Sequence, residues 1–277
     1  MTAIALGLAA SLSWGVADFL GGIQSRRMPV VAVVLGSQLS GLVLVAIVVA
    51  VRGEGMPGGD FLLYASLSSV GGIIGLTAFY RALSIGAMGV VAPLSSTAAV
   101  IPLVVGIATG DHPSTVQAAG VAVAIVGVVL ASREAGEHGS MSRGAGWALL
   151  SAVGFGSFFL AMDKASDSDV LWAVCVNRAV STALLAMALL VTRPTLGLRL
   201  RDMRTLAVVG VLDILANGFF AVAATKGLVS VVSVLASLYP VVTVVLARVV
   251  LHERLRLVQR AGAALALAGV ALISAGG

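Results

Sequence analysis

Ionisable residues lie in the middle of long apolar runs, where a charge is costly. Arg178 is near the middle of the run 169–192, and Asp213 is near the middle of the run 204–225. A charge at the centre of a bilayer costs at least roughly 2.5–3.5 kcal/mol on insertion scales. The two residues are on consecutive runs at similar depth, so they could form an ion pair. Two interpretations remain open: a structural pair within the second half of the chain, or a pair that faces a cavity and binds the charge of a substrate.

Two further polar residues could take part in the same chemistry. Asn217 follows Asp213 by four residues, so these two side chains share a helix face. Asp18 lies in the outer half of the first apolar run, four residues after Trp14. A carboxylate in that position could take up and release a proton. The alternative is an interfacial aspartate that reaches water or turns toward Arg26 and Arg27.

Small residues and prolines punctuate the apolar runs. Ser230, Ser233 and Ser237 share one helix face, which indicates close helix packing or, alternatively, a cavity lining. Gly71, Gly72 and Gly75 have the same two interpretations. We expect helix kinks where a proline removes a backbone hydrogen bond, at Pro93, Pro102 and Pro240.

No catalytic constellation is visible in the sequence. The three histidines, His112, His138 and His252, are far apart and lie at run ends or in loops. Metal-ligand spacing, a phosphate-binding loop and a nucleophile motif are all missing. We therefore expect no enzymatic activity, no catalytic residue, no metal and no cofactor. Without a nucleotide site, active transport would have to use an ion gradient or the gradient of the solute itself.

The composition requires lipid as the main solvent. The chain has 277 residues, of which 59% are hydrophobic and 10% are charged, and its mean hydropathy is +1.10. A soluble domain has about a quarter charged residues. The net charge of +5 comes without a basic stripe or stacking platform, so we expect contact with lipid headgroups and no nucleic acid. The single cysteine, Cys175, lies in an apolar run and leaves the redox compartment open.

Ten apolar runs have the length of about 20 residues that a bilayer core requires. They are 2–23, 29–51, 61–83, 88–109, 114–132, 144–162, 169–192, 204–225, 229–251 and 256–275. The runs are continuous rather than alternating, which disfavours a β-barrel. The sequence therefore predicts an all-α, multi-pass integral membrane protein with ten transmembrane helices.

The two halves of the chain are related by a repeat. The charged linker 133–143 has five runs on either side. Matched residues recur at an offset that drifts in order from 140 to 142: Ser11 with Ser151, Phe19 with Phe159, Gly86 with Gly227, Gly120 with Gly262, Gln117 with Gln259, and Gly127 with Gly269. We expect five-helix repeats at 1–134 and 144–277. Because five is odd, the halves are inverted relative to each other, as in carriers that work by alternating access.

Three stretches resemble a known family. Ser237-Leu238-Tyr239-Pro240 with the later turn Glu253-Arg254-Leu255 resembles the end of an EamA-type repeat. Trp14-Gly15 resembles the signature of the first helix of that repeat, and Arg178 stands where its second helix often carries an arginine. The chain thus resembles the EamA branch of the drug/metabolite transporter superfamily over its whole length. The first half departs from the pattern, with Gln38 in place of the arginine and Asp111-His112-Pro113 in place of Glu-Arg-Leu.

The resemblance implies a carrier of a metabolite or drug, often outward, in a ten-helix fold. Small multidrug pumps of the same superfamily use a first-helix carboxylate for coupling, which implies that role for Asp18, although their residue is Glu. The candidate substrate and coupling residues are Asp18, Gln38, Arg178, Asp213, Asn217, Ser237 and Tyr239.

The expected function is secondary active export of a small metabolite or drug across the plasma membrane. One alternative is sugar uptake, which the aromatic content of 5% slightly disfavours, since rings stack on sugars. A membrane enzyme acting on lipid would need clustered His, Asp or Glu. A non-transporting scaffold would have no use for polar residues near the midplane. The expected partners are a small-molecule substrate and lipid; the oligomeric state stays open, a homodimer included.

The charge distribution predicts an orientation. The side that carries loops 1–2, 3–4, 5–6, 7–8 and 9–10 holds 13 of the 17 Lys and Arg residues, and the side with both termini holds 3; Arg178 is intramembrane. Cytoplasmic loops carry the excess of Lys and Arg, so this count predicts both termini outside. The family resemblance implies the opposite, with both termini in the cytoplasm. We follow the count because the loops are short.

Overall fold

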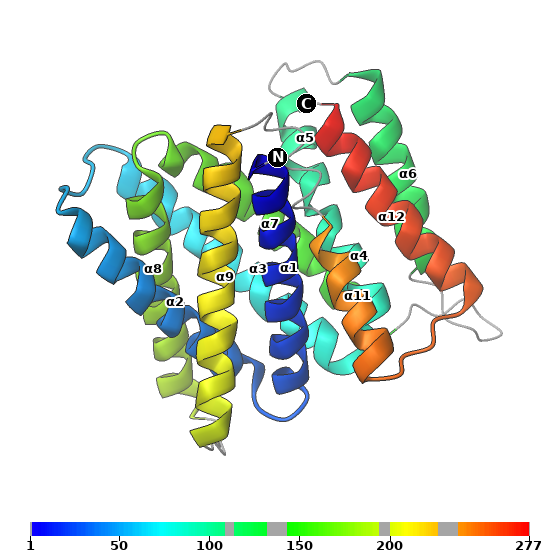
Figure 1. Cartoon of the computed structure of the whole chain (residues 1–277), viewed down its shortest axis with the longest axis horizontal. Coiled ribbons are helices and arrows are strands. Elements are labelled where there is room, and N and C mark those ends of the chain that lie inside the picture. Colours follow the sequence, from blue (N-terminus) through cyan, green and yellow to red (C-terminus); the bar gives the residue numbers. More distant parts are fainter. Residues whose placement is uncertain (1, 109–113, 132–142, 194–199, 227–237, 277) are drawn as a thin grey trace.

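A computed structural model describes residues 2–108, 114–131, 143–193, 200–226 and 238–276, and all regular structure in these ranges is helical (Figure 1). The helices are α1 (Thr2–Ser25), α2 (Val30–Arg52), α3 (Phe61–Ile85), α4 (Met88–Ser96), the 3-10 helix η1 (Thr97–Ala99), α5 (Val100–Ala108), α6 (Thr115–Ala131), α7 (Ala145–Ser166), α8 (Val170–Thr192), α9 (Leu200–Lys226), α11 (Tyr239–Val250) and α12 (Leu257–Ala275).

The helices agree with the predicted membrane spans. Within the described ranges, α1, α2, α3, α7, α8 and α9 are each long and apolar enough to cross a bilayer. Shorter apolar helices occupy the positions of the fourth, fifth, ninth and tenth runs. Most of the part of the ninth run that precedes α11 lies outside the described residues. The chain is thus an all-helical, multi-pass membrane protein, and ten helices fit the structure.

The fourth run is interrupted rather than smoothly bent. It consists of α4, the 3-10 turn η1 and α5, with Pro93 inside α4 and Pro102 near the start of α5. Side-chain hydroxyl groups donate hydrogen bonds to backbone carbonyls near this break. Ser96 Oγ donates to the Pro93 carbonyl at 2.8 Å, and Thr97 Oγ1 donates to the Leu94 carbonyl at 2.7 Å. A short 3-10 stretch inside a longer helix often marks a hinge. The helix is interrupted between the two prolines, and the kinks expected at Pro93 and Pro102 stay predictions.

The third proline stands in a different setting. Pro240 is in the first turn of α11, where a missing N–H costs no intrahelical hydrogen bond. The residues 227–237 before it are outside the described part of the chain, so the expected kink there stays a prediction.

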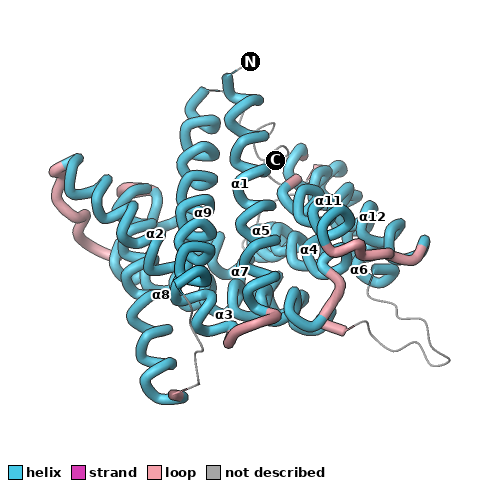
Figure 2. Tube along the Cα trace, turned by 60° about the horizontal axis from the view of Figure 1, so that its bottom comes forward, coloured by secondary structure: helices cyan, strands magenta, loops and turns pink. Residues whose placement is uncertain are grey.

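Helices of the two halves pack against one another through small residues. In Figures 1 and 2, α6 and α12 run side by side at one edge of the bundle. A Cβ atom on Gly127 would lie 2.2 Å from the backbone N of Ala266, and one on Gly269 would lie 2.4 Å from the backbone N of Ala124. Such distances require glycine, because backbone atoms cannot yield as a flexible side chain does.

The same device joins α3 to α7. A Cβ atom on Gly154 would lie 2.4 Å from the backbone N of Gly75, and one on Gly71 would lie 3.0 Å from the carbonyl oxygen of Gly154. The expectation of close packing at Gly71 and Gly75 is therefore confirmed. Close contacts between the halves also join α1 to α9 and α11, α2 to α8 and α9, α3 to α8, and α4 to α7, α11 and α12.

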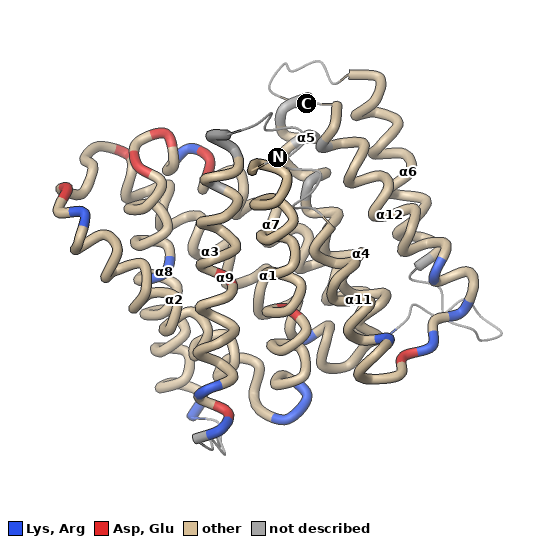
Figure 3. The backbone as a smooth tube through the Cα atoms, viewed as in Figure 1, with Lys and Arg blue, Asp and Glu red and all other residues tan. Residues whose placement is uncertain are grey.

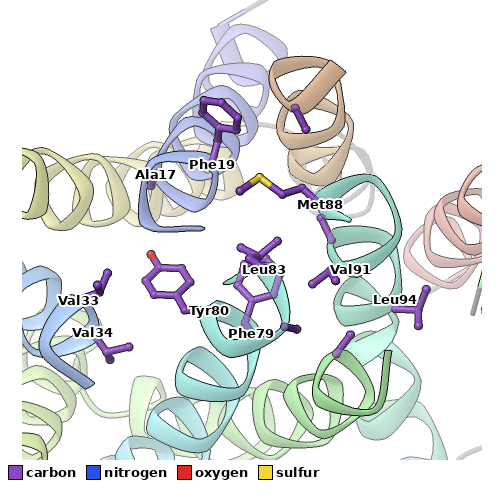
Figure 4. Packing of buried hydrophobic residues seen from close by; sticks show 14 of the residues in the cluster. Ala17, Phe19, Val33, Val34, Phe79, Tyr80, Leu83, Met88, Val91 and Leu94 are labelled. Atoms are coloured by element: carbon purple, nitrogen blue, oxygen red, sulfur yellow. The ribbon is translucent and has the colours of Figure 1, made fainter. Parts of the chain in front are cut away.

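A tightly packed apolar cluster fills the bundle toward the α1–α2 and α3–α4 turns (Figure 4). It includes Phe19 of α1, Val33 and Val34 of α2, Phe79, Tyr80 and Leu83 of α3, and Met88 and Val91 of α4, each at most 5% exposed. By contrast, many large apolar side chains on the outer surface are exposed, such as Leu190 at 74% and Val191 at 77%. An outer surface made of large apolar side chains is what a helix bundle in contact with lipid requires.

Charged residues gather at the two ends of the bundle (Figure 3). Lys and Arg dominate the end that holds the α1–α2 turn, the start of α9 and the α11–α12 turn, whereas the opposite end also carries several Asp and Glu residues. The structure thus separates the charges as the loop count requires, while the orientation itself stays a prediction.

Candidate functional site

A cavity of about 180 Å³ lies between the halves of the chain, lined by residues of α1, α2, α3, α7, α8, α9 and α11. Its polar lining residues are Asp18, Gln38, Asn177, Arg178, Asp213 and Asn217. Its aromatic lining residues are Trp14, Phe79, Phe155, Phe158, Phe159 and Tyr239. The cavity thus combines opposite charges, amide groups and rings in one space near the middle of the membrane-spanning bundle.

Arg178 and Asp213 form an ion pair in this cavity. An Arg178 Nη atom donates to Asp213 Oδ2, and the other Nη atom donates to Gln38 Oε1. The side chains are 13% exposed for Arg178 and 30% exposed for Asp213, so the aspartate is the more accessible partner. Arg178 Nε is buried without a hydrogen-bond partner in the described residues. The predicted pairing of the two charges is confirmed.

Asp18 contributes a second carboxylate to the same cavity. It also lines a smaller adjoining chamber of about 20 Å³, together with Tyr80, Gln38 and Arg178. A space of that size holds about one water molecule. Among the residues that the structure describes, no Lys or Arg lies within salt-bridge distance of Asp18. The alternative in which Asp18 turns toward Arg26 is wrong, because Arg26 bonds to the α3–α4 turn and to Glu253.

The two amides beside the ion pair have different partners. Asn217 Nδ2 donates to the backbone carbonyl of Asp213 at 2.7 Å, so its side chain is held against its own helix. Asn177 Nδ2 donates to Ser68 Oγ at 2.9 Å, and Ser69 Oγ donates to the backbone carbonyl of Asn177 at 3.1 Å. Asn177 was not among the predicted site residues, although its place next to Arg178 in the sequence was a usable signal.

Except for Tyr239, the rings that line the cavity were also missed by sequence reasoning. Six of the chain's 14 aromatic residues (8 Phe, 3 Trp and 3 Tyr) line it. Trp14 lies edge-on to Tyr239, with ring centroids 6.3 Å apart, and Phe158 lies edge-on to Phe159 at 5.4 Å. The signal was the spacing of Phe155, Phe158 and Phe159, which places three rings on one face of α7. An aromatic content of 5% says nothing about such local concentration.

The structure brings together six of the seven predicted site residues. Asp18, Gln38, Arg178, Asp213, Asn217 and Tyr239 all line the cavity. Ser237 lies outside the described residues, as do Ser230 and Ser233. The roles of all seven predicted residues in substrate binding and coupling stay predictions.

Bonds between the halves hold both ends of the bundle. At the end of α2, Arg52 pairs with Glu54 of its own loop and, at 2.7 Å, with Asp169, which caps α8. Trp172 Nε1 donates to the carbonyl oxygen of Glu54 at 3.1 Å. At the other end, Glu253 of the α11–α12 turn pairs with Arg26 of the α1–α2 turn at 3.2 Å.

The described residues hold no group of three or more His, Cys, Asp or Glu residues that could bind a metal ion. What the cavity offers is reversible binding chemistry: ion pairing, hydrogen bonding and contact with ring faces.

Comparisons with known proteins agree with a carrier. The family model described as "EamA-like transporter family" matches residues 1–133 and again residues 142–275. No curated protein matches the chain. A solved structure, titled only "Crystal structure of protein", is similar with a TM-score of 0.65 at 18% sequence identity, and the alignment covers 98% of this chain and 96% of that chain. At this identity the likeness shows the fold alone.

Proposed function

The chain belongs to the EamA-like transporter family, and from this premise we propose that it is a secondary active transporter that exports a small polar or amphipathic metabolite or drug across the plasma membrane. The observation that carries this proposal is the central cavity, because charged, amide and aromatic side chains from both halves line it. Polar groups are expensive at this depth, so their concentration around one space indicates a binding site. A non-transporting scaffold would not need it.

The proposed mechanism is alternating access by two inverted repeats, residues 1–134 and 144–277. The packing supports this, because it keeps its pattern when the halves are exchanged. The contact of α1 with α9 becomes the contact of α7 with α3, and the contacts of α2 with α8 and of α6 with α12 exchange into themselves. The glycine contacts obey the same exchange: Gly127 on Ala266 becomes Gly269 on Ala124 at an offset of 142 residues. Gln38 and Arg178, which are matched positions, contact each other.

The two kinds of charge in the cavity have different proposed roles. The Arg178–Asp213 pair binds charged or strongly polar groups of the substrate, since both side chains line the cavity and Asp213 keeps 30% of its side chain exposed. Asp18 has no cationic partner in the described residues and lies across the small chamber from the pair. Asp18 therefore exchanges a proton during the cycle and couples export to the proton gradient.

Sugar uptake is the second candidate, and one observation favours it. Six rings line the cavity, and aromatic faces stack on sugar rings. The argument against sugars from the overall aromatic content does not hold, because the few aromatic residues are concentrated at this site. The two candidates differ in direction and in the need for a proton gradient.

The experiment is a solute screen with the purified full-length protein in proteoliposomes. Accumulation of each solute is measured with and without an imposed proton gradient, in both gradient directions. Export coupled to protons predicts gradient-dependent accumulation of at least one amine, amino acid or drug and none of sugars. Sugar accumulation that ignores the gradient selects the second candidate. If no solute exchanges above empty liposomes while the protein keeps its size-exclusion profile, the transporter proposal is wrong.

A further inference from the structure

Three turns that are far apart in the sequence meet at one carboxylate. Glu253 of the α11–α12 turn accepts from Arg26 Nη2 at 3.2 Å and from the backbone N–H of Met88 at 3.1 Å through Oε1. Its Oε2 accepts from the backbone N–H of Gly89 at 3.2 Å. We call this group the Glu253 latch: Arg26, Glu253 and the first two N–H groups of α4. It ties α1, α4 and α12 together at a single end of the bundle.

Both members of the Arg26–Glu253 ion pair are held in place by other hydrogen bonds. Arg26 also donates through Nε to the carbonyl oxygen of Leu83 at 3.2 Å and through Nη2 to that of Gly86 at 3.3 Å. On the other side, Arg248 Nη1 donates to the backbone carbonyl of Glu253 at 3.1 Å. His252 adopts a φ of 56°, a left-handed conformation that residues other than glycine rarely adopt. This bend turns the chain back so that Glu253 reaches α4.

The latch adjoins the part of the apolar cluster that contains Phe19, Leu83 and Met88, which we call the plug. A Cβ atom on Gly22 would lie 2.8 Å from Met88 Cε and 3.0 Å from Leu83 Cδ1, so α1 packs tightly on the α3–α4 turn. A Cβ atom on Gly89 would lie 2.6 Å from Leu255 Cδ1, so the α11–α12 turn covers the first turn of α4. Figure 4 shows Phe19, Leu83 and Met88 close together in this plug.

The element that the latch holds is a separate short segment. At the end opposite the latch, α4 runs into the 3-10 turn Thr97–Ala99, and Pro93 weakens its backbone bonding further. All nine residues of α4 are buried, and the helix packs against α7, α11 and α12, so it can move only as a unit that leaves these contacts. Its N-terminal dipole favours a carboxylate, which makes the anchor strong but reversible.

The geometry points to the Glu253 latch as the gate that seals the cavity at this end of the bundle: while Glu253 holds Arg26 and the N-terminus of α4, the plug is shut, and releasing both lets α4 swing away on its 3-10 hinge and opens the cavity to the arginine-rich face. This inference rests on the proposed alternating-access function. It assigns to Glu253 a gating role that is separate from substrate binding, because Glu253 does not line the cavity.

The test measures how fast a cysteine behind the latch is labelled. Cys175, the single native cysteine, is first replaced by serine. Ala17→Cys then places a thiol in the wall of the small chamber that adjoins the cavity, where Ala17 is 2% exposed. A membrane-impermeant charged maleimide is added to vesicles of each orientation. A second protein with Arg254→Cys, an exposed position in the α11–α12 turn, identifies the preparation that presents the latch face.

With the latch intact, we expect slow labelling of the Ala17→Cys thiol from the latch face. Glu253→Gln and Arg26→Gln each remove charge-assisted bonds of the latch and should raise that rate at least about tenfold. Arg27→Gln is the matched control, because Arg27 adjoins Arg26 on the same exposed turn; it should change the rate less than about twofold. If Glu253→Gln does not fold, Arg26→Gln carries the test.

Rates within about twofold of the latch-intact protein in every well-folded latch variant would overturn the gate. Labelling needs no substrate, so the two proposals can fail separately. Faster labelling in latch variants of a protein that transports nothing keeps the gate and rejects the transporter. Unchanged labelling in a protein that transports rejects the gate alone.

Discussion

Removing both partners of the central ion pair should cost less than the sum of the costs of removing each partner alone. Arg178→Gln leaves the Asp213 carboxylate without its cation, and Asp213→Asn leaves the guanidinium without its anion. Removing one partner of a buried pair typically costs 3–5 kcal/mol. Asp213 is 30% exposed to the cavity, so water can compensate part of the loss, and we expect the lower end of that range, about 3 kcal/mol, for each single variant.

The double variant separates the free energy of pairing from the effect of losing two charged groups. Arg178→Gln with Asp213→Asn leaves two neutral amides that can bond to each other and to Gln38. We expect its destabilisation to be smaller than the sum of the singles by about 2 kcal/mol, which is within the usual range for residues in contact.

The assay is thermal unfolding of the purified protein in one detergent, followed by tryptophan fluorescence. At about 2–4 °C per kcal/mol for a chain of this size class, each single variant should lower Tm by about 6–12 °C. The control is Arg81→Gln, an exposed arginine near the end of α3, which should stay within about 0.5 kcal/mol of the unmodified protein. Additive effects of the two singles, or singles as stable as the control, would refute the reasoning.

Three further predictions concern coupling, packing and orientation. Asp18→Asn should abolish gradient-driven transport but leave downhill exchange, as measured in proteoliposomes; full gradient-driven activity rejects the coupling role. Gly127→Ala should lower stability by about 1–3 kcal/mol because its Cβ would meet the backbone of Ala266, whereas the matched change Gly218→Ala, with nothing within 4 Å, should be neutral or slightly stabilising by thermal unfolding. Reporters fused after Gly277 should show activity if they work only outside the cytoplasm and none if they work only in the cytoplasm. Activity of a cytoplasmic reporter in a well-expressed fusion would show that the charge count fails.

The positions of the helices and of the polar cavity residues could be read from the sequence for one reason. A bilayer enforces a length of apolar chain and makes each polar intrusion expensive. Arg178 and Asp213 stood out against apolar runs, and their pairing followed from equal depth. The break in the fourth helix was signalled by Pro93 and Pro102, since proline removes a backbone donor.

The aromatic cavity residues and the long-range contacts could not be predicted, because nothing in the sequence around them sets them apart. Phe155 and Phe158 are apolar residues in an apolar run, so their spacing places them on one helix face but does not tell whether that face meets the cavity or lipid. Glu253 stood out only as part of the Glu-Arg-Leu turn of the family resemblance, and only the fold brings it to α4. Its partner Arg26 is 227 residues away, a separation that no local pattern spans.

The contact between α6 and α12 has a consequence for how such a chain can be assembled. Positions 120, 124 and 127 meet 269, 266 and 262, and each of the first set corresponds to one of the second at an offset of 142. A surface that binds its own counterpart is isologous, the geometry of a symmetric dimer. Each half therefore already carries both sides of its own joint. Two copies of one half would fit each other through this face even without the linker that joins the halves in this chain.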